Sequence, residues 1–362
     1  MLSARVPEEG KLRPALSLLT ASVLVAACGA SASSSHPSPS PSYVAVSPTP
    51  AATAGTALNC RLPVAGYMSG ATNVTPETQV GAGGFVEFPS GNYTPVAASD
   101  KSYLASADAW LPVSPESISP DGKTYVQVES RTKANPSVPV TTLYLVDVKT
   151  GTKRVLLKSS EREAVYALSW ISEGIYAIVF RLNSGEATRL IHIDPATGAS
   201  QAVAGSDLPN GAFGEIIGDA AWGTSQIFAN GPPVRLLRLG LRDGKVTVWY
   251  ENPTPFVIVG FDADNHPIIA TFNFAVGSSQ VTLVTAPLKT SRIETTGGSF
   301  LTDRPVWVTD SHGTWMAGLD GTIWLYSSGA GLRKVASVPA QPGGSGHLGE
   351  DPRARSIAGP CV

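Results

Sequence analysis

Two cysteines enclose most of this 362-residue sequence and offer its clearest covalent chemistry. Cys60 and Cys361 have no cysteine between them, so a disulfide would close a loop of about 300 residues. Closing so long a loop removes entropy from the unfolded chain, an effect nominally worth ~5 kcal/mol. An exported, oxidising setting favours this bond, and the alternative is two unpaired thiols at frayed ends. A bond between the two ends would suit a circular fold.

Two segments begin like ligand-binding motifs but lack a required feature. Gly344 to Gly349 matches G-x-G-x-x-G, yet no helix opens after it and no βαβ unit surrounds it. We interpret it as a flexible loop. Asp262-Ala-Asp-Asn265 begins like a calcium loop, but Pro267 occupies the glycine position and Asn273 the glutamate position. We interpret this segment as a hairpin turn.

The histidines form no metal-binding or catalytic pattern. The five are scattered along the chain, and neither G-x-S-x-G nor H-E-x-x-H occurs. His192 and Asp194 lie on one face of a predicted strand, which we interpret as the solvated face and not as a metal site. The sequence therefore predicts no catalytic, metal-binding or cofactor-binding residue, although residues distant in sequence can still converge in a ring-shaped fold.

Composition restricts the class of protein. Charged residues make up 15% of the chain, the formal net charge is −2, and there are 36 Gly and 29 Pro. So few charges and so many turn-forming residues exclude a coiled coil, a helical solenoid and a highly charged disordered chain. Because the chain has no basic excess, we expect no nucleic-acid partner.

The first 28 residues have the pattern of an export signal. Basic residues precede a 13-residue apolar stretch that ends at Ala27 and is too short to span a bilayer. The stretch closes with V-A-A before Cys28, which is similar to a bacterial lipobox. That similarity implies that the Cys28 thiol takes a lipid and becomes the new N-terminus. The alternative is an ordinary signal peptide cleaved near Ala27.

A second segment, residues 28–59, is rich in Ser, Pro and Ala and contains no Asp, Glu, Lys or Arg. Such a composition cannot bury enough apolar surface to offset the entropy of ordering, so we expect a disordered tether. The chain is thus divided into a lipoprotein signal peptide, 1–27, the tether, and a folded domain, 60–362. We expect the mature protein on the extracytoplasmic face of the bacterial cell membrane, held by lipid on Cys28.

The folded domain is a repeat of short β-strands. Apolar residues alternate with period two, and turn signals recur at Gly91, Gly151, Gly198, Gly244, Thr290 and Gly329. A second series consists of bulky apolar residues before polar turns, namely Ile118, Trp170, Trp222, Phe261 and Trp307. We expect these to pack between repeats, near the innermost strand. A period of about 40–50 residues with four strands per unit is typical of a β-propeller.

The six turn signals predict an all-β, six-bladed propeller. Seven blades are the alternative, because residues 92–116 and 339–356 could hold further strands. We expect the C-terminal A-R-S-I-A-G-P-C-V to add a strand to the unit that begins at Cys60. Both ends of the domain would then lie in one blade and close the ring.

One repeat carries a recognisable motif. Ser119-Pro-Asp-Gly122, followed by a β-run and by Asp147-Val-Lys-Thr-Gly151, resembles the repeat of TolB-type propellers, relatives of the WD repeat. C-R-L-P-V at Cys60, W-L-P-V further on and A-G-P-C at Cys361 also resemble lipoproteins of high-GC bacteria that carry one propeller behind a Ser/Pro tether. The resemblance covers the whole folded domain. It implies architecture and location, and it brings no established activity.

Blade geometry gives the expected working surface. Loops that join one blade to the next, and the second strand to the third, share one face of a propeller. We assign to this face Arg131 to Val138, Ser159 to Glu163, Asn183 to Glu186, Gly205 to Asp219, Asn230 to Pro233 and Gly298 to Arg304.

We expect that face to bind a protein or a glycan of the cell envelope without catalysis. The alternative is a propeller hydrolase or lyase, in which acids such as Asp219 and Asp303 converge on the axis, with or without a divalent cation.

A substitution at Cys28 tests the predicted anchor. Cys28→Ser removes the thiol that would accept the lipid, so we expect metabolic labelling with palmitate to be lost and the protein to leave the membrane fraction. The wild-type chain labelled in parallel is the control. Unchanged labelling of the variant would exclude lipidation at this residue.

Overall fold

The domain is built from short antiparallel strands, as the period-two pattern predicts. The structure is a computed structural model that describes residues 58–66, 83–97, 100–132, 139–160, 162–181, 189–208, 212–225, 234–273, 278–300, 307–318, 320–339 and 355–362. All of them belong to one compact unit, Ala51–Val362. Cys28, the signal-peptide and tether regions up to residue 57, Asp303 and the 344–349 segment lie outside the described residues.

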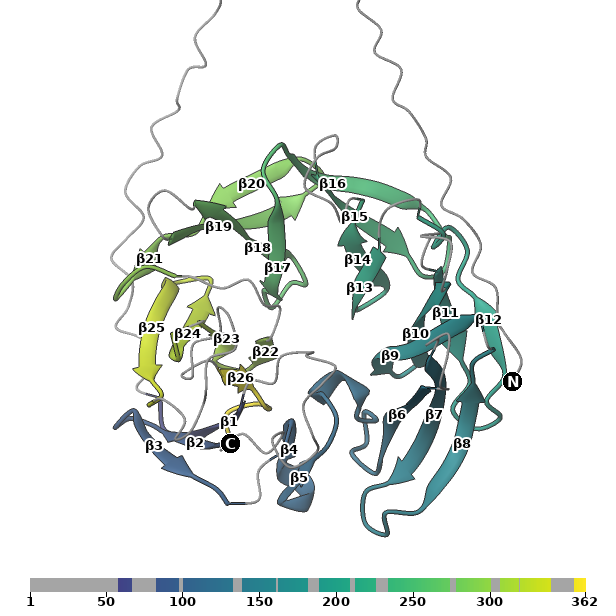
Figure 1. The fold of residues 1–362 in the computed structure, drawn as a ribbon. Helices are drawn as coiled ribbons and strands as arrows, with labels where there is room; N and C mark the ends of the chain where they lie inside the picture. Colours follow the sequence, from purple (N-terminus) through teal and green to yellow (C-terminus); the bar gives the residue numbers. More distant parts are fainter. Residues whose placement is uncertain are drawn as a thin grey trace, which may run out of the picture. The chain divides into compact units, whose positions relative to one another are not determined.

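The sheets are arranged in a ring, which is a six-bladed β-propeller (Figure 1). The blades are numbered along the chain, with strands given from the innermost outward. Blade 1 contains β26 (Arg355–Ile357), β1 (Arg61–Gly66), β2 (Gly84–Glu87) and β3 (Asn92–Pro95). Blade 2 contains β6 (Thr124–Thr132), β7 (Pro139–Asp147) and β8 (Lys153–Lys158), and an isolated Ile118–Tyr125 bridge replaces its innermost strand.

The next blades have four strands each. Blade 3 contains β9 (Glu163–Ile171), β10 (Gly174–Arg181), β11 (Arg189–Ile193) and β12 (Ser200–Ala202). Blade 4 contains β13 (Ala212–Ile217), β14 (Ala220–Thr224), β15 (Val234–Gly240) and β16 (Val246–Asn252). Blade 5 contains β17 (Phe256–Phe261), β18 (Pro267–Asn273), β19 (Ser278–Ala286) and β20 (Lys289–Arg292).

Blade 6 carries one additional strand. It contains β22 (Trp307–Asp310), β23 (Gly313–Ala317), β24 (Thr322–Ser327) and β25 (Gly331–Ser337), and β21 (Thr295–Thr296) pairs with β25 in parallel on the outside. Because β21 follows blade 5 in the chain, this pairing ties blade 5 to blade 6. The six-blade prediction is confirmed.

The segment 92–116 holds strands but no seventh blade. After β3 come a separate hairpin of β4 (Ser102–Leu104) and β5 (Ala109–Leu111), with the 3-10 turn η2 (Ala105–Ala107) between them. A second 3-10 turn, η3 (Pro115–Ser117), precedes blade 2. Within the described residues no helix is long and apolar enough to cross a membrane.

Aspartates shape the turns that mark the repeat. The Asp147 carboxylate accepts hydrogen bonds from the Thr150 amide (2.7 Å) and hydroxyl (2.8 Å), and these bonds lower the pKa of Asp147. Gly151 follows with φ of 68°, a left-handed conformation that glycine adopts without steric cost. Asp194 forms the same kind of turn with the Ala196 amide at 2.7 Å. The D-x-x-T-G pattern is thus a turn-forming sequence.

The periodic aromatic residues join neighbouring blades. Trp222 and Phe261 lie with ring centroids 5.7 Å apart between blades 4 and 5, and Phe261 lies 5.3 Å from Trp307 of blade 6. Trp222 and Phe261 are buried. The expected packing between blades is confirmed for these three and for the half-buried Trp170, which packs against a cluster shared by blades 2 and 3. Ile118 packs instead against a cluster of blade 2 and the segment before it.

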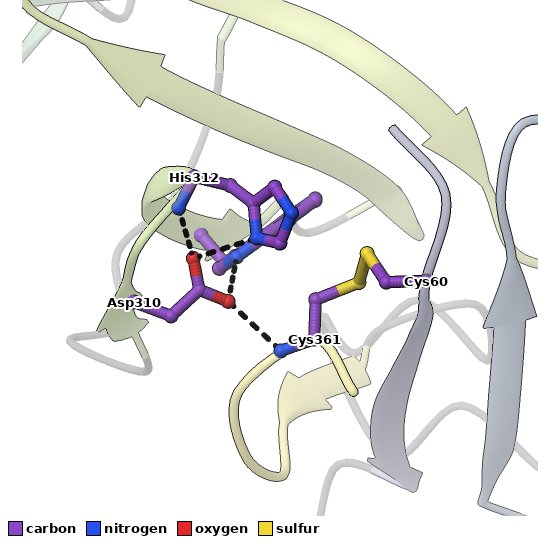
Figure 2. Close-up of a disulfide and its surroundings, with 5 residues drawn as sticks. Cys60, Asp310, His312 and Cys361 are labelled. Carbon is purple, nitrogen blue, oxygen red and sulfur yellow. Dashed lines mark hydrogen bonds and ion pairs between the residues drawn. A yellow bond between two sulfur atoms is a disulfide. The ribbon is translucent and has the colours of Figure 1, made fainter. Parts of the chain in front are cut away.

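The ring is closed by the C-terminal strand, as the sequence predicts. β26 pairs antiparallel with β1, placing Val64 opposite Ile357 and Gly66 opposite Arg355. The Sγ atoms of Cys60 and Cys361 are joined in a disulfide directly beyond this pairing (Figure 2).

A carboxylate of blade 6 also holds the chain end. Asp310 Oδ2 accepts hydrogen bonds from the Cys361 amide (2.8 Å) and from Trp315 Nε1 (2.7 Å), while Oδ1 accepts the His312 amide at 2.7 Å (Figure 2). The side chain of Asp310 is only 9% exposed. This network fastens the end of blade 1 to the first hairpin of blade 6.

Removing the disulfide tests how much it adds to ring closure. We expect Cys60→Ala to lower the melting temperature by an amount equivalent to about 2–4 kcal/mol, because the unfolded chain regains loop entropy. The circular dichroism should stay β-rich, because the β1–β26 pairing and the Asp310 network remain. A reductant should shift the wild-type transition and leave the variant unchanged. Free thiols at both positions in the exported wild-type protein would contradict the bond.

Candidate functional site

The innermost strands determine which side chains reach the centre of the ring. β9, β13, β17, β22 and β26 lie closest to that centre (Figure 1). Three of them, in consecutive blades, carry a β-bulge, and the extra residues are Leu168, Gly214 and Val259. The spacing of these bulges follows the blade repeat. A bulge changes the direction of the side chains beside it, so these bulges help to determine which side chains face the centre of the ring.

Two glutamates that are remote in sequence lie beside the innermost strand of blade 3. Glu215 directly follows the bulge residue Gly214 on β13 of blade 4. Glu116 lies on η3, which Pro115 begins, ahead of blade 2. Both η3 and β13 lie against β9 of blade 3, so β9 brings the two acids into the same neighbourhood.

The surroundings of both glutamates are enclosed but retain contact with solvent. Each side chain is only half-buried, although each carboxyl lies deep among protein atoms. Beside Glu215, a Cβ added to the exposed Gly214 would meet no heavy atom within 4 Å. An enclosed carboxyl with partial solvent contact and open space beside it is able to meet a small ligand group.

Burial changes the ionisation of the pair. It raises the pKa of Glu215 to about 8, and the negative charge of Glu116 adds to the rise. Burial also raises the pKa of Glu116, against a hydrogen bond from Ser114 and another from its own backbone. At neutral pH the Glu215 carboxyl therefore holds its proton and acts as a hydrogen-bond donor. A protonated acid beside a second carboxyl can bind polar groups or exchange a proton with them.

Asp219, one of the two acids that the sequence suggested for the axis, is committed to another contact. Asp219 lies in the turn between β13 and β14, is 70% exposed, and forms a 2.6 Å ion pair with Arg238 on β15. It does not belong to the enclosed pair. Asp303 lies outside the described residues.

The calcium-like segment is a hairpin turn, which confirms the interpretation from sequence. Asp262 directly follows β17, and its Oδ1 accepts the amides of Asp264 (2.9 Å) and His266 (2.8 Å). Potential ligand atoms of these three residues lie within 4.8 Å of one another. The lone pairs of Asp262 are, however, used by the turn, and its Oδ2 meets His266 Nδ1 at 3.0 Å. Asp310 and His312 repeat this aspartate–histidine arrangement in blade 6.

His192 makes contacts within its own blade. Its Nε2 donates to the Glu173 carbonyl at 2.8 Å, and its ring packs on Tyr176 with centroids 5.1 Å apart. These contacts tie β11 to the turn between β9 and β10.

The predicted working face needs one correction. Gly205 to Asp219 is not a single loop, because it contains β13, and Asp219 lies in a turn at the opposite end of that strand. The assignment failed because Gly214 and Glu215 interrupt the apolar alternation of this strand. Most of Arg131–Val138, Asn183–Glu186 and Asn230–Pro233 lies outside the described residues.

Sequence reasoning also missed Glu116 and Glu215. The available signal was a single acid within the apolar run Ala212–Ile217, directly after a glycine. Glu116 has no such signal, because it precedes the first regular strand of its blade.

Comparisons with known proteins show similarity of fold alone. No family model matches the chain, and no curated protein matches it. Among solved structures, TolB from Acinetobacter baumannii is 15% identical with a TM-score of 0.46, over 75% of this chain and 62% of that chain. An oligogalacturonate lyase from Vibrio parahaemolyticus is 11% identical with a TM-score of 0.42, over 72% of each chain. A prolyl endopeptidase is 13% identical with a TM-score of 0.42, over 70% of this chain and 38% of that chain.

The raised pKa of Glu215 predicts a pH dependence of stability. Between pH 4.5 and about 8 the folded state keeps a proton that the unfolded state loses, so stability falls as pH rises, by at most about 1.4 kcal/mol per pH unit. Glu215→Gln removes this ionisation. We expect the melting temperature of the variant, relative to that of the wild type, to increase from pH 5 to pH 8.5, as measured by calorimetry.

The matched control for this measurement is Asp219→Asn, which neutralises an exposed acid of the same blade. We expect its difference from the wild type to show no comparable rise over this pH range. A Glu215→Gln curve parallel to that of the wild type would show that Glu215 titrates normally.

Proposed function

We propose that this chain is a lipid-anchored propeller of the bacterial cell envelope that binds a protein or glycan partner without catalysis. The observation that carries the proposal is the enclosed carboxyl pair, Glu116 and Glu215, held beside the innermost strand β9 in a ring with fastened ends. A rigid ring that presents a few polar groups in an enclosed space suits recognition.

The proposed location is supported by the covalent chemistry of the chain. The Cys60–Cys361 disulfide is typical of proteins that fold in an oxidising, exported compartment. The lipobox-like residues before Cys28 and the uncharged segment 28–59 agree with export and tethering. A tether of this composition would let the ring reach beyond the membrane surface.

The chemistry of the partner is suggested by the ionisation of the pair. At neutral pH the Glu215 carboxyl donates a hydrogen bond, while unprotonated carboxyl oxygens of the pair accept. Hydroxyl groups of a glycan and amide groups of a peptide both offer a donor and an acceptor. Either class of partner can therefore satisfy the pair without a change in covalent bonds.

A propeller hydrolase or lyase is the second candidate, and one observation favours it. An acid with a pKa of about 8 is protonated at neutral pH and can serve as a general acid, with the neighbouring Glu116 as its partner. This differs from the pair that the sequence suggested, because Asp219 is committed to Arg238.

One set of variants separates the two candidates. Full-length wild type, Glu116→Gln/Glu215→Gln and Asp219→Asn are crosslinked in intact cells and captured, and the same proteins are assayed for metal content and for turnover of glycans and esters. If the chain is a binding protein, we expect wild type and Asp219→Asn to capture a defined partner, and the double variant to capture at least tenfold less of it. None of the three proteins should then show turnover. Turnover that the double variant loses would replace binding by the enzyme candidate. Equal capture by all three proteins would exclude the pair from recognition.

A further inference from the structure

The contacts between neighbouring blades are unequal around the ring. In five of the six junctions, one hydrophobic cluster contains buried residues of both blades. Representative members are Leu143 and Ile175 for blades 2 and 3, Leu190 and Phe213 for 3 and 4, Trp222 and Phe261 for 4 and 5, Val281 and Met316 for 5 and 6, and Trp315 and Leu62 for 6 and 1.

The junction of blades 1 and 2, here called the seam, is built differently. Among the described residues no hydrophobic cluster contains members of both blades. The β4–β5 hairpin lies between them instead (Figure 1). On its blade 1 side the Tyr103 amide donates to the Ala358 carbonyl at 2.8 Å, next to β26.

Contacts of the hairpin with blade 1 are aromatic and polar. Phe85 of β2 packs against Tyr103 and Trp110 of the hairpin, with ring centroids 4.9 and 5.7 Å apart. The Arg61 guanidinium lies over the Phe85 ring, 4.4 Å from its centroid. The Tyr103 hydroxyl donates to Asp108 Oδ1 at 2.5 Å and accepts from Arg61 Nη2 at 3.2 Å. Tyr103 is thus the side chain that connects the hairpin turn to blade 1.

Contacts of the hairpin with blade 2 are few and apolar. Leu111 and Val113 share a small cluster with Tyr125 and Val146. The turn η2 also lies close to the Ser119–Gly122 turn, because a Cβ on Gly122 would lie 3.1 Å from Ser106 Oγ.

The covalent bond, the strand pairings and the hydrogen-bond network that hold the ring closed do not cross the seam. The disulfide and the β1–β26 pairing act within blade 1, the Asp310 network joins blades 6 and 1, and β21 joins blades 5 and 6. The seam therefore depends on the hairpin, and opening it breaks a smaller apolar contact than opening any other junction would.

We propose that the ring opens reversibly at the seam, with the β4–β5 hairpin acting as a strap that carries Glu116 toward or away from Glu215. The connection is covalent and short, because Leu111 ends the hairpin and η3 begins at Pro115. Opening gives lateral access to the centre of the ring. It also removes one wall of the space around Glu215 and takes the charge of Glu116 away from it.

Other charged and titratable groups stand on the strands packed against η3 and β13. Among the side chains that the structure describes, these groups are Tyr125 and Glu129 on β6, Glu163 and Tyr166 on β9, Tyr176 on β10, and Arg189 and His192 on β11. Glu129 pairs with Lys153, and Glu163 pairs with Arg189. The acid that acts on the ionisation of Glu215 is Glu116.

Native-state hydrogen exchange of the full exported chain tests the opening. In the wild type we expect amides of 102–111 and 113–118 to exchange at least tenfold faster than those of β13–β16, because the seam opens without global unfolding. Tyr103→Phe removes the hydroxyl that connects Arg61 and Asp108, and should speed exchange in 102–111 about fivefold. Asp108→Asn, a surface change, should act in the same direction.

The matched control is Tyr250→Phe in blade 4. The Tyr250 hydroxyl accepts a hydrogen bond from Asn252 Nδ2 at 2.8 Å, and its ring packs on Phe256 within an ordinary junction. We expect this variant to leave exchange in 102–111 unchanged. Equal protection of the hairpin and blade 4 in the wild type, or a Tyr103→Phe effect spread evenly over all blades, would overturn the opening.

A titration of Glu215 tests the link to the centre. Carboxyl-carbon NMR of the Tyr103→Phe protein should show the apparent pKa of Glu215 shifted down from its wild-type value toward 4.5, while Tyr250→Phe keeps the wild-type value. An unshifted titration in a protein whose hairpin does exchange faster would show that the strap moves without Glu116 and would overturn the coupling.

Discussion

Ring closure by the last strand is the constraint on which the rest of the structure depends. β26 comes from the C-terminus and β1 from the start of the domain, so blade 1 exists only when the two ends of a long chain meet. Its core then joins that of blade 6, where Ile357 and Trp315 belong to one cluster. Closure covers the edge of β1, which is otherwise free to pair with another chain, and buries the apolar face of blade 1 against blade 6.

The central carboxyls gain their properties from this closure. Glu116 and Glu215 stand about 100 residues apart and come from elements on different sides of blade 3. Only the assembled ring surrounds them with enough protein to raise their pKa values. The aspartates of the turns show the opposite behaviour, because backbone amides around Asp147 and Asp194 stabilise the charged form and lower the pKa. Hydrogen-bond donors lower the pKa of the turn aspartates, whereas desolvation raises the pKa of the two glutamates.

The repeat is regular where blades touch directly and irregular where another element intervenes. Blades 3, 4 and 5 share a bulge at equivalent positions and exchange apolar side chains across each junction. Blade 2 has lost a regular innermost strand, and the hairpin before it fills the junction with aromatic and polar contacts. The hairpin, which departs most from the repeat, is thus followed along the chain by Glu116.

Much of the architecture was predictable from sequence, because turns and alternation are local. Gly151 and Gly198 mark left-handed turn positions, and the period between such turns gives the number of blades. The closing strand was also predictable, since the tail has the alternation of a strand and a cysteine that matches Cys60. Asp262 was correctly interpreted as part of a hairpin, because Pro267 breaks the calcium pattern.

The candidate site was decided by tertiary structure. No local feature of the sequence distinguishes Glu116 from an exposed acid. By sequence Asp219 is an equally good candidate for the axis, and only the structure shows its ion pair with Arg238. Burial, proximity and charge coupling depend on elements brought together by ring closure, and a one-residue bulge at Gly214 determines how Glu215 is aimed. Sequence by itself determined the repeat and its closure, whereas only the folded ring decided which acids are enclosed, because enclosure is a property of neighbours that are remote along the chain.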